Sequence, residues 1–245
     1  MNAYEVTLNA PDSNLINGRG RYAGGPQVPL SVIDVIQGKR YRMRITNMAC
    51  RPHYIFSIDN HMLTVIEADG HNTVPLVVDS FQILPGQRYS FILNANQTVD
   101  NYWIRANPNV KPTFAAGINS AILRYAGAPL SEPNFKPWVL TNPLLEQNLQ
   151  ALENPAAPGS PVSGGADVSL NLVSTLGING KYYMNGVSYT PPPTPVLLQI
   201  LSGKLDVSQL EPNGSVYTLP PNKVIELSIP GGQLDGPVSN VFFLS

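Results

Sequence analysis

The feature that most constrains the fold is a series of short β-type segments, each closed by turn-forming residues. In Tyr41–Ile45 the apolar side chains alternate with Arg42 and Arg44, which is the two-residue period of a strand with one solvent-facing side. Strands are predicted at Ser31–Ile36, Arg40–Thr46, Tyr54–Ile58, Met62–Ala68, Leu76–Leu84, Tyr89–Asn94, Tyr102–Ala106 and Ser120–Tyr125. About eight short strands, separated by clusters of Gly, Pro, Asn and Asp, predict a β-sandwich or barrel.

Composition excludes several classes of protein. The chain has 245 residues, enough to bury a core without disulfides, and its one cysteine cannot form an internal disulfide. Charged residues make up 13% and the net charge is −1, so nothing in the charge balance indicates a nucleic-acid partner. No apolar run reaches the roughly 18 residues of a membrane-spanning helix. The first residues lack the basic and apolar regions of a signal peptide.

Residues 129–165 differ from the rest because they are rich in proline and contain one short helical candidate, Asn142–Leu152. The segment is predicted to be an interdomain linker that packs along a surface. Its apolar side chains need a protein surface to pack against. They are Trp138, Leu144, Leu145 and Leu149.

Strands are predicted again beyond the linker, at Val168–Ser174, Lys181–Met184, Val196–Leu201, Ser215–Thr218 and Lys223–Ile229. A complete sandwich domain usually needs ~100 residues and seven or more strands. The sequence therefore predicts that the second domain is incomplete.

The histidines are the first candidates for metal ligands. A blue-copper site needs two His, one Cys and a weak axial ligand such as Met. Cys50, His53 and Met62 superficially offer part of this set, but no histidine precedes His53. His61 and His71 lie at opposite ends of a predicted strand, up to ~33 Å apart if the chain stays extended. We therefore interpret them as turn and surface histidines, not as metal ligands.

The other motifs indicate structure more than chemistry. Glu67 and Asp69 share a strand face, but acid–base work needs a cleft and a partner, so solvated strand-end acids are predicted. Gly18-Arg19-Gly20 lacks the flanking strand and helix of a phosphate loop, and no Gly-x-Ser-x-Gly motif is present. Core packing is predicted for the aromatic residues Tyr54, Phe56, Tyr89, Phe91, Tyr102 and Trp103. Asn96 and Asn213 each begin an N-glycosylation sequon, which favours a secreted origin.

Several segments resemble the middle domain of fungal (basidiomycete-type) laccases, which are multicopper oxidases. They are LINGRGR at 15–21, GKRYRMRITNMAC at 38–50, FSIDNHMLTVIEADGHNT at 56–73 and DNYWIRANPN at 100–109. NGVSYTPPPTPVLLQILSG and LPPNKVIELSIP resemble the start of the third domain. The resemblance implies an all-β fold. Residues 1–128 are expected to form a cupredoxin-like (plastocyanin-like) Greek-key sandwich, 129–165 the linker, and 166–245 an incomplete third cupredoxin-like domain.

The resemblance also implies a chemistry that this chain lacks the motifs to perform. Laccases oxidise phenols, including those of lignin, by one-electron steps and reduce oxygen to water with copper held by paired-histidine motifs in the first and third domains. None of those ligands maps onto this chain, so copper belongs to the parent family and no metal is expected here. The sequence predicts a truncated, secreted-type family member that is inactive alone. Alternatives are a splice product, a complement to a separate first-domain polypeptide, or a non-catalytic interaction module that associates through exposed edges of the incomplete domain.

The family's site residues are altered where they map onto this chain. An acidic residue usually follows the middle-domain cysteine and accepts the phenolic proton; here it is Arg51, which stays protonated. An aromatic often follows the Asn-Pro-Asn turn and lines the substrate pocket; here it is Val110. Cys50 matches the cysteine that usually bridges to the first domain, so a free thiol is expected. The preferred phenol and the oligomeric state stay open.

Overall fold

The computed structural model describes residues 12–49, 53–109, 114–134 except 116, 138–160 except 155, 162, 164–210 except 205, 215–229 and 240–244. The chain divides into two compact units, Met1–Pro155 and Ala156–Ser245. This division falls inside the segment predicted as a linker, and the predicted boundaries at 128/129 and 165/166 stay a prediction.

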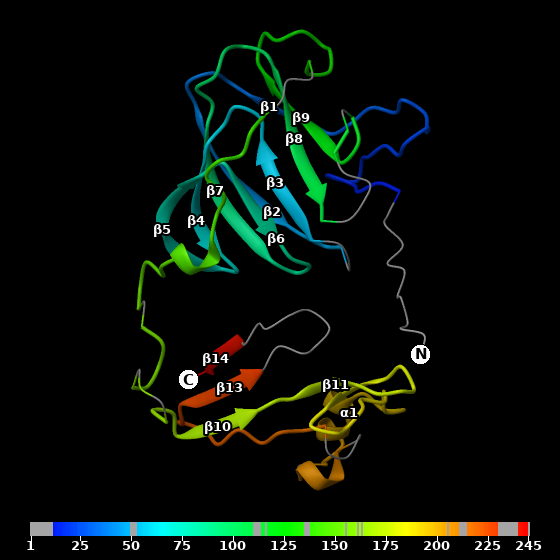
Figure 1. Cartoon of the computed structure of the whole chain (residues 1–245), viewed down its shortest axis with the longest axis vertical. Helices are drawn as coiled ribbons and strands as arrows, with labels where there is room; N and C mark the ends of the chain where they lie inside the picture. The colour runs from blue at the N-terminus through cyan, green and yellow to red at the C-terminus, as the bar shows by residue number, and fades with distance from the viewer. Residues whose placement is uncertain are drawn as a thin grey trace. The chain divides into compact units, whose positions relative to one another are not determined.

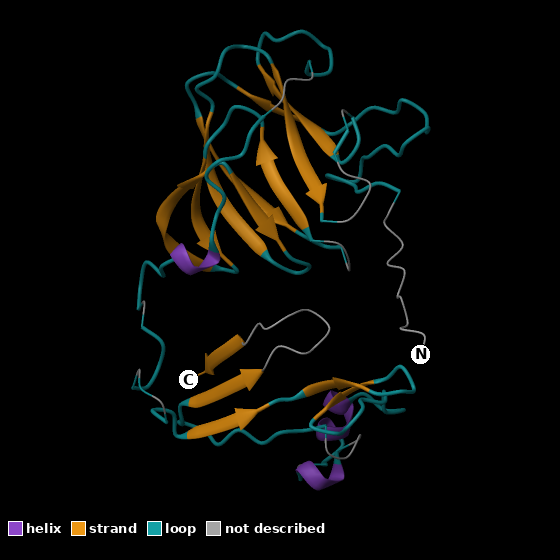
Figure 2. Ribbon diagram, viewed as in Figure 1, coloured by secondary structure: helices purple, strands orange, loops and turns teal. Residues whose placement is uncertain are grey.

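Unit 1 is a sandwich of two sheets (Figures 1 and 2). The five-stranded sheet has the order β1 (Val32–Val35), β9 (Ser120–Tyr125), β8 (Asn101–Pro108), β3 (Tyr54–Ile58) and β6 (Ser80–Ile83). The four-stranded sheet has the order β2 (Arg40–Thr46), β7 (Arg88–Asn94), β4 (Leu63–Ala68) and β5 (His71–Val78). The first strand pairs in parallel with the last, and the other pairs are antiparallel. The all-β prediction is confirmed.

The core of unit 1 lies between the two sheets. Phe56 and Phe81 stack with ring centroids 5.1 Å apart, and Phe91 packs against both. All six aromatic residues predicted to be core are buried. Trp103 belongs to a separate cluster with Leu30, because it follows Tyr102 in β8 and so points to the other face of the sheet.

Leu76–Leu84 was predicted to be one strand, and this prediction is wrong. The segment contains the end of β5 and all of β6, which belong to different sheets. Asp79 lies between them and is buried. Its carboxylate accepts hydrogen bonds from the backbone N–H groups of Thr141 and Asn142, at 2.5 and 2.6 Å. The alternation of apolar residues therefore continues across the point where the chain passes from one sheet to the other. This corner is fixed by residues distant in the sequence.

Residues 139–152, called the strap below, lie along this corner. Asp79 N–H donates to the Asn142 carbonyl, and Leu144 N–H donates to the Ser80 carbonyl. Leu144 is buried in the core, so the predicted packing along a surface is confirmed for this part of the segment, whereas Leu145 is exposed. The helix predicted at Asn142–Leu152 is reduced to one 3₁₀ turn, Glu146–Asn148, because the backbone on both sides forms β-bridges to residues of β5 and β6.

Unit 2 contains a three-stranded sheet and a two-stranded sheet. The first has the order β10 (Val168–Asn171), β13 (Ile225–Ile229) and β14 (Asn240–Leu244), and the second pairs β11 (Ser174–Leu176) with β12 (Tyr182–Met184). The predicted strand Val168–Ser174 is thus split between two sheets, and no strand forms at Ser215–Thr218.

The prediction of a strand at Val196–Leu201 is also wrong, because these residues form helix α1. Pro195 precedes the helix, where its lack of an N–H costs nothing, and leucine is a good helix former. Gln199 is buried, and its Nε2 donates to the Thr194 carbonyl. No helix among the described residues is both long and apolar enough to cross a membrane.

Asp79→Asn should loosen the strap and destabilise unit 1. Burial opposes ionisation, but the N–H groups of Asn142 and Thr141 and the Ser80 hydroxyl outweigh it, so the pKa of Asp79 is lowered. A carboxylate with a lowered pKa stabilises the fold above its unfolded pKa of about 4, and this stability is lost as the pH falls through the folded value. We expect a loss of about 1.5–3 kcal/mol at neutral pH.

Tryptophan fluorescence measures this change in chemical denaturation, since both tryptophans, Trp103 and Trp138, lie in unit 1. The matched control is Asp34→Asn, because Asp34 is exposed. Equal unfolding free energies for the two variants would contradict the role given to Asp79.

Candidate functional site

The substrate-pocket positions expected from the sequence, Arg51 and Val110, lie outside the described residues, as does Cys50. Their described neighbours are brought together. Tyr54 at the start of β3 pairs with Pro108 at the end of β8. Asn109 N–H donates to the His53 carbonyl at 3.1 Å. The antiparallel pairing therefore brings the start of β3 and the end of β8 to the same end of the five-stranded sheet.

His61 closes a turn, because its N–H donates to the Ile58 carbonyl at 3.1 Å, but it is only 1% exposed, so its interpretation as a surface histidine is wrong. Its Nδ1 lies 2.7 Å from the Asp59 carbonyl, and its Nε2 lies 2.7 Å from the Tyr125 hydroxyl. A carbonyl can only accept, so Nδ1 carries the proton and the tyrosine donates to Nε2. Burial lowers the pKa of His61, and the bond to Asp59 opposes this shift only in part. The ring is therefore a neutral structural element.

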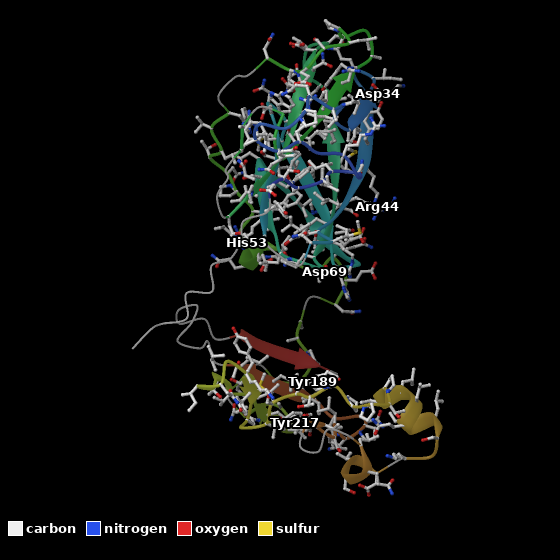
Figure 3. The ribbon with its side chains drawn as sticks, turned by 90° about the vertical axis from the view of Figure 1, so that its right-hand side faces the viewer. Asp34, Arg44, His53, Asp69, Tyr189 and Tyr217 are labelled. Carbon is white, nitrogen blue, oxygen red and sulfur yellow. The ribbon has the colours of Figure 1, made fainter. Side chains whose placement is uncertain are left out.

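The described residues do not fit a copper site. No group of three or more His, Cys, Asp and Glu side chains gathers in the described part of the chain. Both ring nitrogens of His61 are already bonded. His71 is exposed at the start of β5, and His53 lies half-buried before β3 (Figure 3). The chemistry of these donors supports no copper-dependent step within the described residues.

A buried ion pair lies on the outer side of the five-stranded sheet. Arg105 Nε and Nη2 donate to the two carboxylate oxygens of Asp59 at 2.5 and 2.6 Å. The guanidinium also stacks over Phe114, 4.0 Å from the ring centroid. Burial raises the pKa of Asp59, and Arg105 opposes this shift. This ion pair was not predicted from the sequence. The arginine within the otherwise apolar strand β8 could have indicated it, because a buried arginine needs a carboxylate partner.

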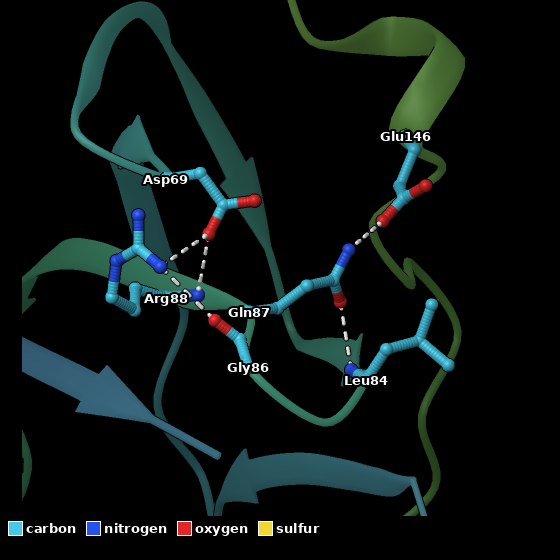
Figure 4. Close-up of polar contacts among 6 residues, drawn as sticks. All are labelled: Asp69, Leu84, Gly86, Gln87, Arg88 and Glu146. Atoms are coloured by element: carbon cyan, nitrogen blue, oxygen red, sulfur yellow. Dashed lines mark hydrogen bonds and ion pairs between the residues drawn. The ribbon is translucent and has the colours of Figure 1, made fainter. Parts of the chain in front are cut away.

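Glu67 and Asp69 do not form a catalytic pair. The Ser90 hydroxyl and the Arg42 guanidinium bind Glu67 and lower its pKa. Asp69 accepts from the Arg88 backbone N–H at 2.9 Å and lies 3.7 Å from its guanidinium (Figure 4). Asp69 is a solvent-exposed strand-end acid as predicted, whereas Glu67 is half-buried and paired.

One small cavity lies near the buried ion pair. It has a volume of about 20 Å³ and is lined by Asp59, Asn60, Asp100, Asn101, Tyr102, Trp103, Pro133 and Asn134. This volume accommodates about one water molecule and is too small for an aromatic substrate. Asn96, the first glycosylation candidate, is exposed in the loop between β7 and β8, and Asn213 lies outside the described residues.

His61→Gln should remove a pH dependence of stability. The folded pKa of His61 is lowered, so the unfolded chain binds more protons than the folded chain below about pH 6.5. Wild-type unit 1 should therefore lose stability as the pH falls from about 7 towards the folded pKa, and the variant should not. His71→Gln is the control, because His71 is exposed. Denaturation followed at several pH values checks this, and identical pH profiles for His61→Gln and wild type would contradict it.

Removing one partner of the buried ion pair should be costly. Asp59→Asn or Arg105→Met leaves a buried charge without its counterion, and we expect each to cost about 3–5 kcal/mol. The double variant should cost clearly less than the sum of the two, because no unpaired charge remains. A double-mutant cycle of unfolding free energies measures this. Additive effects would show that the two side chains are not coupled.

Comparisons with known proteins agree with this architecture. The family model for multicopper oxidases matches residues 1–128. Laccase-2 of Pleurotus ostreatus is 57% identical over 95% of this chain and 44% of its own length. Laccase-3 of Trametes villosa is 55% identical over 94% of this chain and 49% of its own length. The chain thus spans about half the length of the relatives that it matches.

Two solved structures have the same fold. The multicopper oxidase Fet3p superposes with a TM-score of 0.66 at 22% identity, over 82% of this chain and 39% of that one, and shows the shared fold. The laccase from Botrytis aclada superposes with a TM-score of 0.61 at 25% identity, over 91% of this chain and 43% of that one. With the family match over residues 1–128, these findings show that the chain belongs to the multicopper oxidase family and is of the fungal laccase type.

Proposed function

We propose that this chain supplies the middle domain of a laccase, which walls the phenol pocket and supports domains that hold copper. The 57% identity to a Pleurotus laccase over 95% of the chain carries this proposal. The proposed activity of the whole protein is one-electron oxidation of phenols coupled to reduction of oxygen to water. The described residues of this chain offer no copper site, so its own contribution is shape and charge at the pocket.

The paired ends of β3 and β8 are the proposed pocket wall. His53 and Asn109, which are hydrogen-bonded to each other, lie close in sequence to Arg51 and Val110. An arginine cannot accept the phenolic proton. A guanidinium also favours anionic partners, so a pocket walled by this chain should prefer phenolates or phenols with a carboxylate over neutral phenols. A small valine would leave more room in the pocket than the aromatic residue often found in relatives.

A second candidate function is a non-catalytic interaction module. Helix α1 of unit 2 carries Leu197 and Leu201, which are 66% and 73% exposed, and Leu198 and Ile200 are exposed as well. Apolar side chains on most sides of one short helix are typical of a surface that another chain or domain covers. Association through this surface is compatible with the laccase proposal and does not require oxidase activity.

The proposal also includes secretion, with Asn96 as a glycosylation site. The Asn96 side chain is exposed, and Thr98 of the same sequon is exposed as well. A secreted fungal protein would travel through the secretory pathway, where the enzyme that glycosylates such asparagines acts.

The experiment has two arms. The chain expressed alone with copper should show neither a blue-copper absorption band nor phenol oxidation, and measurable turnover would overturn the proposal. The matching segment of the Pleurotus laccase is then replaced by this chain. The chimera should hold copper, show the band and oxidise phenols, and a chimera that holds copper but oxidises none would contradict the pocket role.

Within the chimera, Arg51→Asp should raise kcat/KM for neutral phenols by about tenfold or more, because it restores a proton acceptor. Arg19→Asp is the matched control, since it makes the same charge change at an exposed position outside the proposed wall. Equal effects of the two substitutions would show that Arg51 does not act at the pocket.

A further inference from the structure

Strand β2 is an edge strand with one free side. Within the described part of the chain, it pairs only with β7. Ala95 N–H donates to the Lys39 carbonyl at 2.9 Å, and Asn47 N–H donates to the Gln87 carbonyl at 3.1 Å. Hydrogen-bonded pairs alternate along an antiparallel ladder, so the main-chain groups of Arg40, Arg42 and Arg44 point away from β7. These groups can accept a further strand.

The same three arginines have exposed side chains on the outer face of the sheet. Their neighbours Tyr41 and Met43 pack towards the core. Alternate residues of a strand lie ~6.8 Å apart, so the arginines form a straight row of positive charge. A charged edge strand usually serves to prevent aggregation, and this function accounts for the row without a partner.

The charge on this face is not balanced locally. Glu67 pairs with Arg42, and Asp69 pairs with Arg88. Neither Arg40 nor Arg44 forms an ion pair with a described residue. The charge of Arg44 also lowers the pKa of Glu67, after the larger effects of Ser90 and Arg42. The face therefore carries an excess of positive charge on a chain whose net charge is −1.

A second copy of this chain does not suit the edge. Two β2 strands paired with each other would place arginines opposite arginines, and like charges directly opposite are destabilising. A sugar or nucleic acid is also a poor match, because the residues opposite the arginines in β7 are Asn94, Ile92 and Ser90. None of these offers an aromatic ring for stacking.

We propose that the free edge of β2 is a docking site for an extended acidic peptide segment of another protein. The segment would add as a strand, and acidic residues at alternate positions would share the ~6.8 Å repeat of the arginines. Two carboxylates would then lie opposite the guanidinium groups of Arg40 and Arg44, which form no ion pair with a described residue. A guanidinium binds a carboxylate with two parallel hydrogen bonds. Main-chain pairing supplies affinity, and the alternation of charge supplies specificity.

The experiment uses the full chain and a fluorescent peptide of alternating Thr and Glu, about eight residues long, which covers the seven residues of β2. The control is a peptide with the same composition in which all Glu residues stand in one block. Fluorescence anisotropy should show binding of the alternating peptide at low salt and at least about tenfold weaker binding of the block peptide. Methylation of alternate backbone nitrogens should also abolish binding.

Arg40→Gln combined with Arg44→Gln should weaken binding of the alternating peptide by about tenfold or more. The control is Arg19→Gln combined with Lys204→Gln, which removes the same charge from exposed positions elsewhere and should change binding by less than about twofold. Circular dichroism melts confirm that both variants fold.

Three results would overturn the proposal. The first is no measurable binding of the alternating peptide, which would leave the arginines as a solvated, protective edge. The second is equal binding of the block peptide or of the methylated peptide, which would indicate unspecific attraction. The third is that heparin binds more tightly than the alternating peptide and that the Arg40/Arg44 and Arg19/Lys204 variants lose binding equally. This result would favour a polysaccharide.

Discussion

Two sheets can share one core only if the chain crosses between them, and in unit 1 the crossing from β5 to β6 occurs at Asp79. A crossing leaves backbone groups without ladder partners, and these must be bonded in another way. The Asp79 carboxylate meets this need by accepting hydrogen bonds from two N–H groups of the strap. The Asp79 N–H in turn donates to the Asn142 carbonyl. The corner, the strap and the burial of Leu144 in the core therefore depend on one ionised carboxylate.

The outer side of the five-stranded sheet depends on a second buried carboxylate. Asp59 holds the Arg105 guanidinium, which in turn stacks on Phe114 beyond the end of β8. The same stretch of chain places His61, whose ring bonds both to Asp59 and to Tyr125. A short segment after β3 is thus joined to β8 and β9 by side chains. This bonding braces the strands whose other ends bear the proposed pocket wall.

Features that depend on near neighbours in the sequence could be predicted, and features that depend on distant partners could not. The alternation of arginines with Tyr41 and Met43 predicted β2 and its two faces correctly, because each side chain's face follows from a period of two. The corner at Asp79 was missed, since its partners lie 62 and 63 residues away. His61 was misread for the same reason, because Tyr125 is 64 residues distant. In Val196–Leu201 the leucines suit either a strand or a helix, and Pro195 together with the Gln199 bond favours the helix.

The proposed pocket positions and the residues of the core occupy different parts of the sequence, so the two can change independently. Core residues such as Phe56 and Phe91 lie between the sheets, where a change of one methylene affects packing. Arg51 precedes the first residue of β3, Tyr54, by three positions, and Val110 follows the last residue of β8, Pro108, by two. Substitutions at such positions change the charge and size presented to a ligand, while the β3–β8 ladder is held by its own hydrogen bonds and by the Asp59–Arg105 pair. Under the proposed function, arginine in place of the usual acid changes the charge at the pocket and alters no residue of the core.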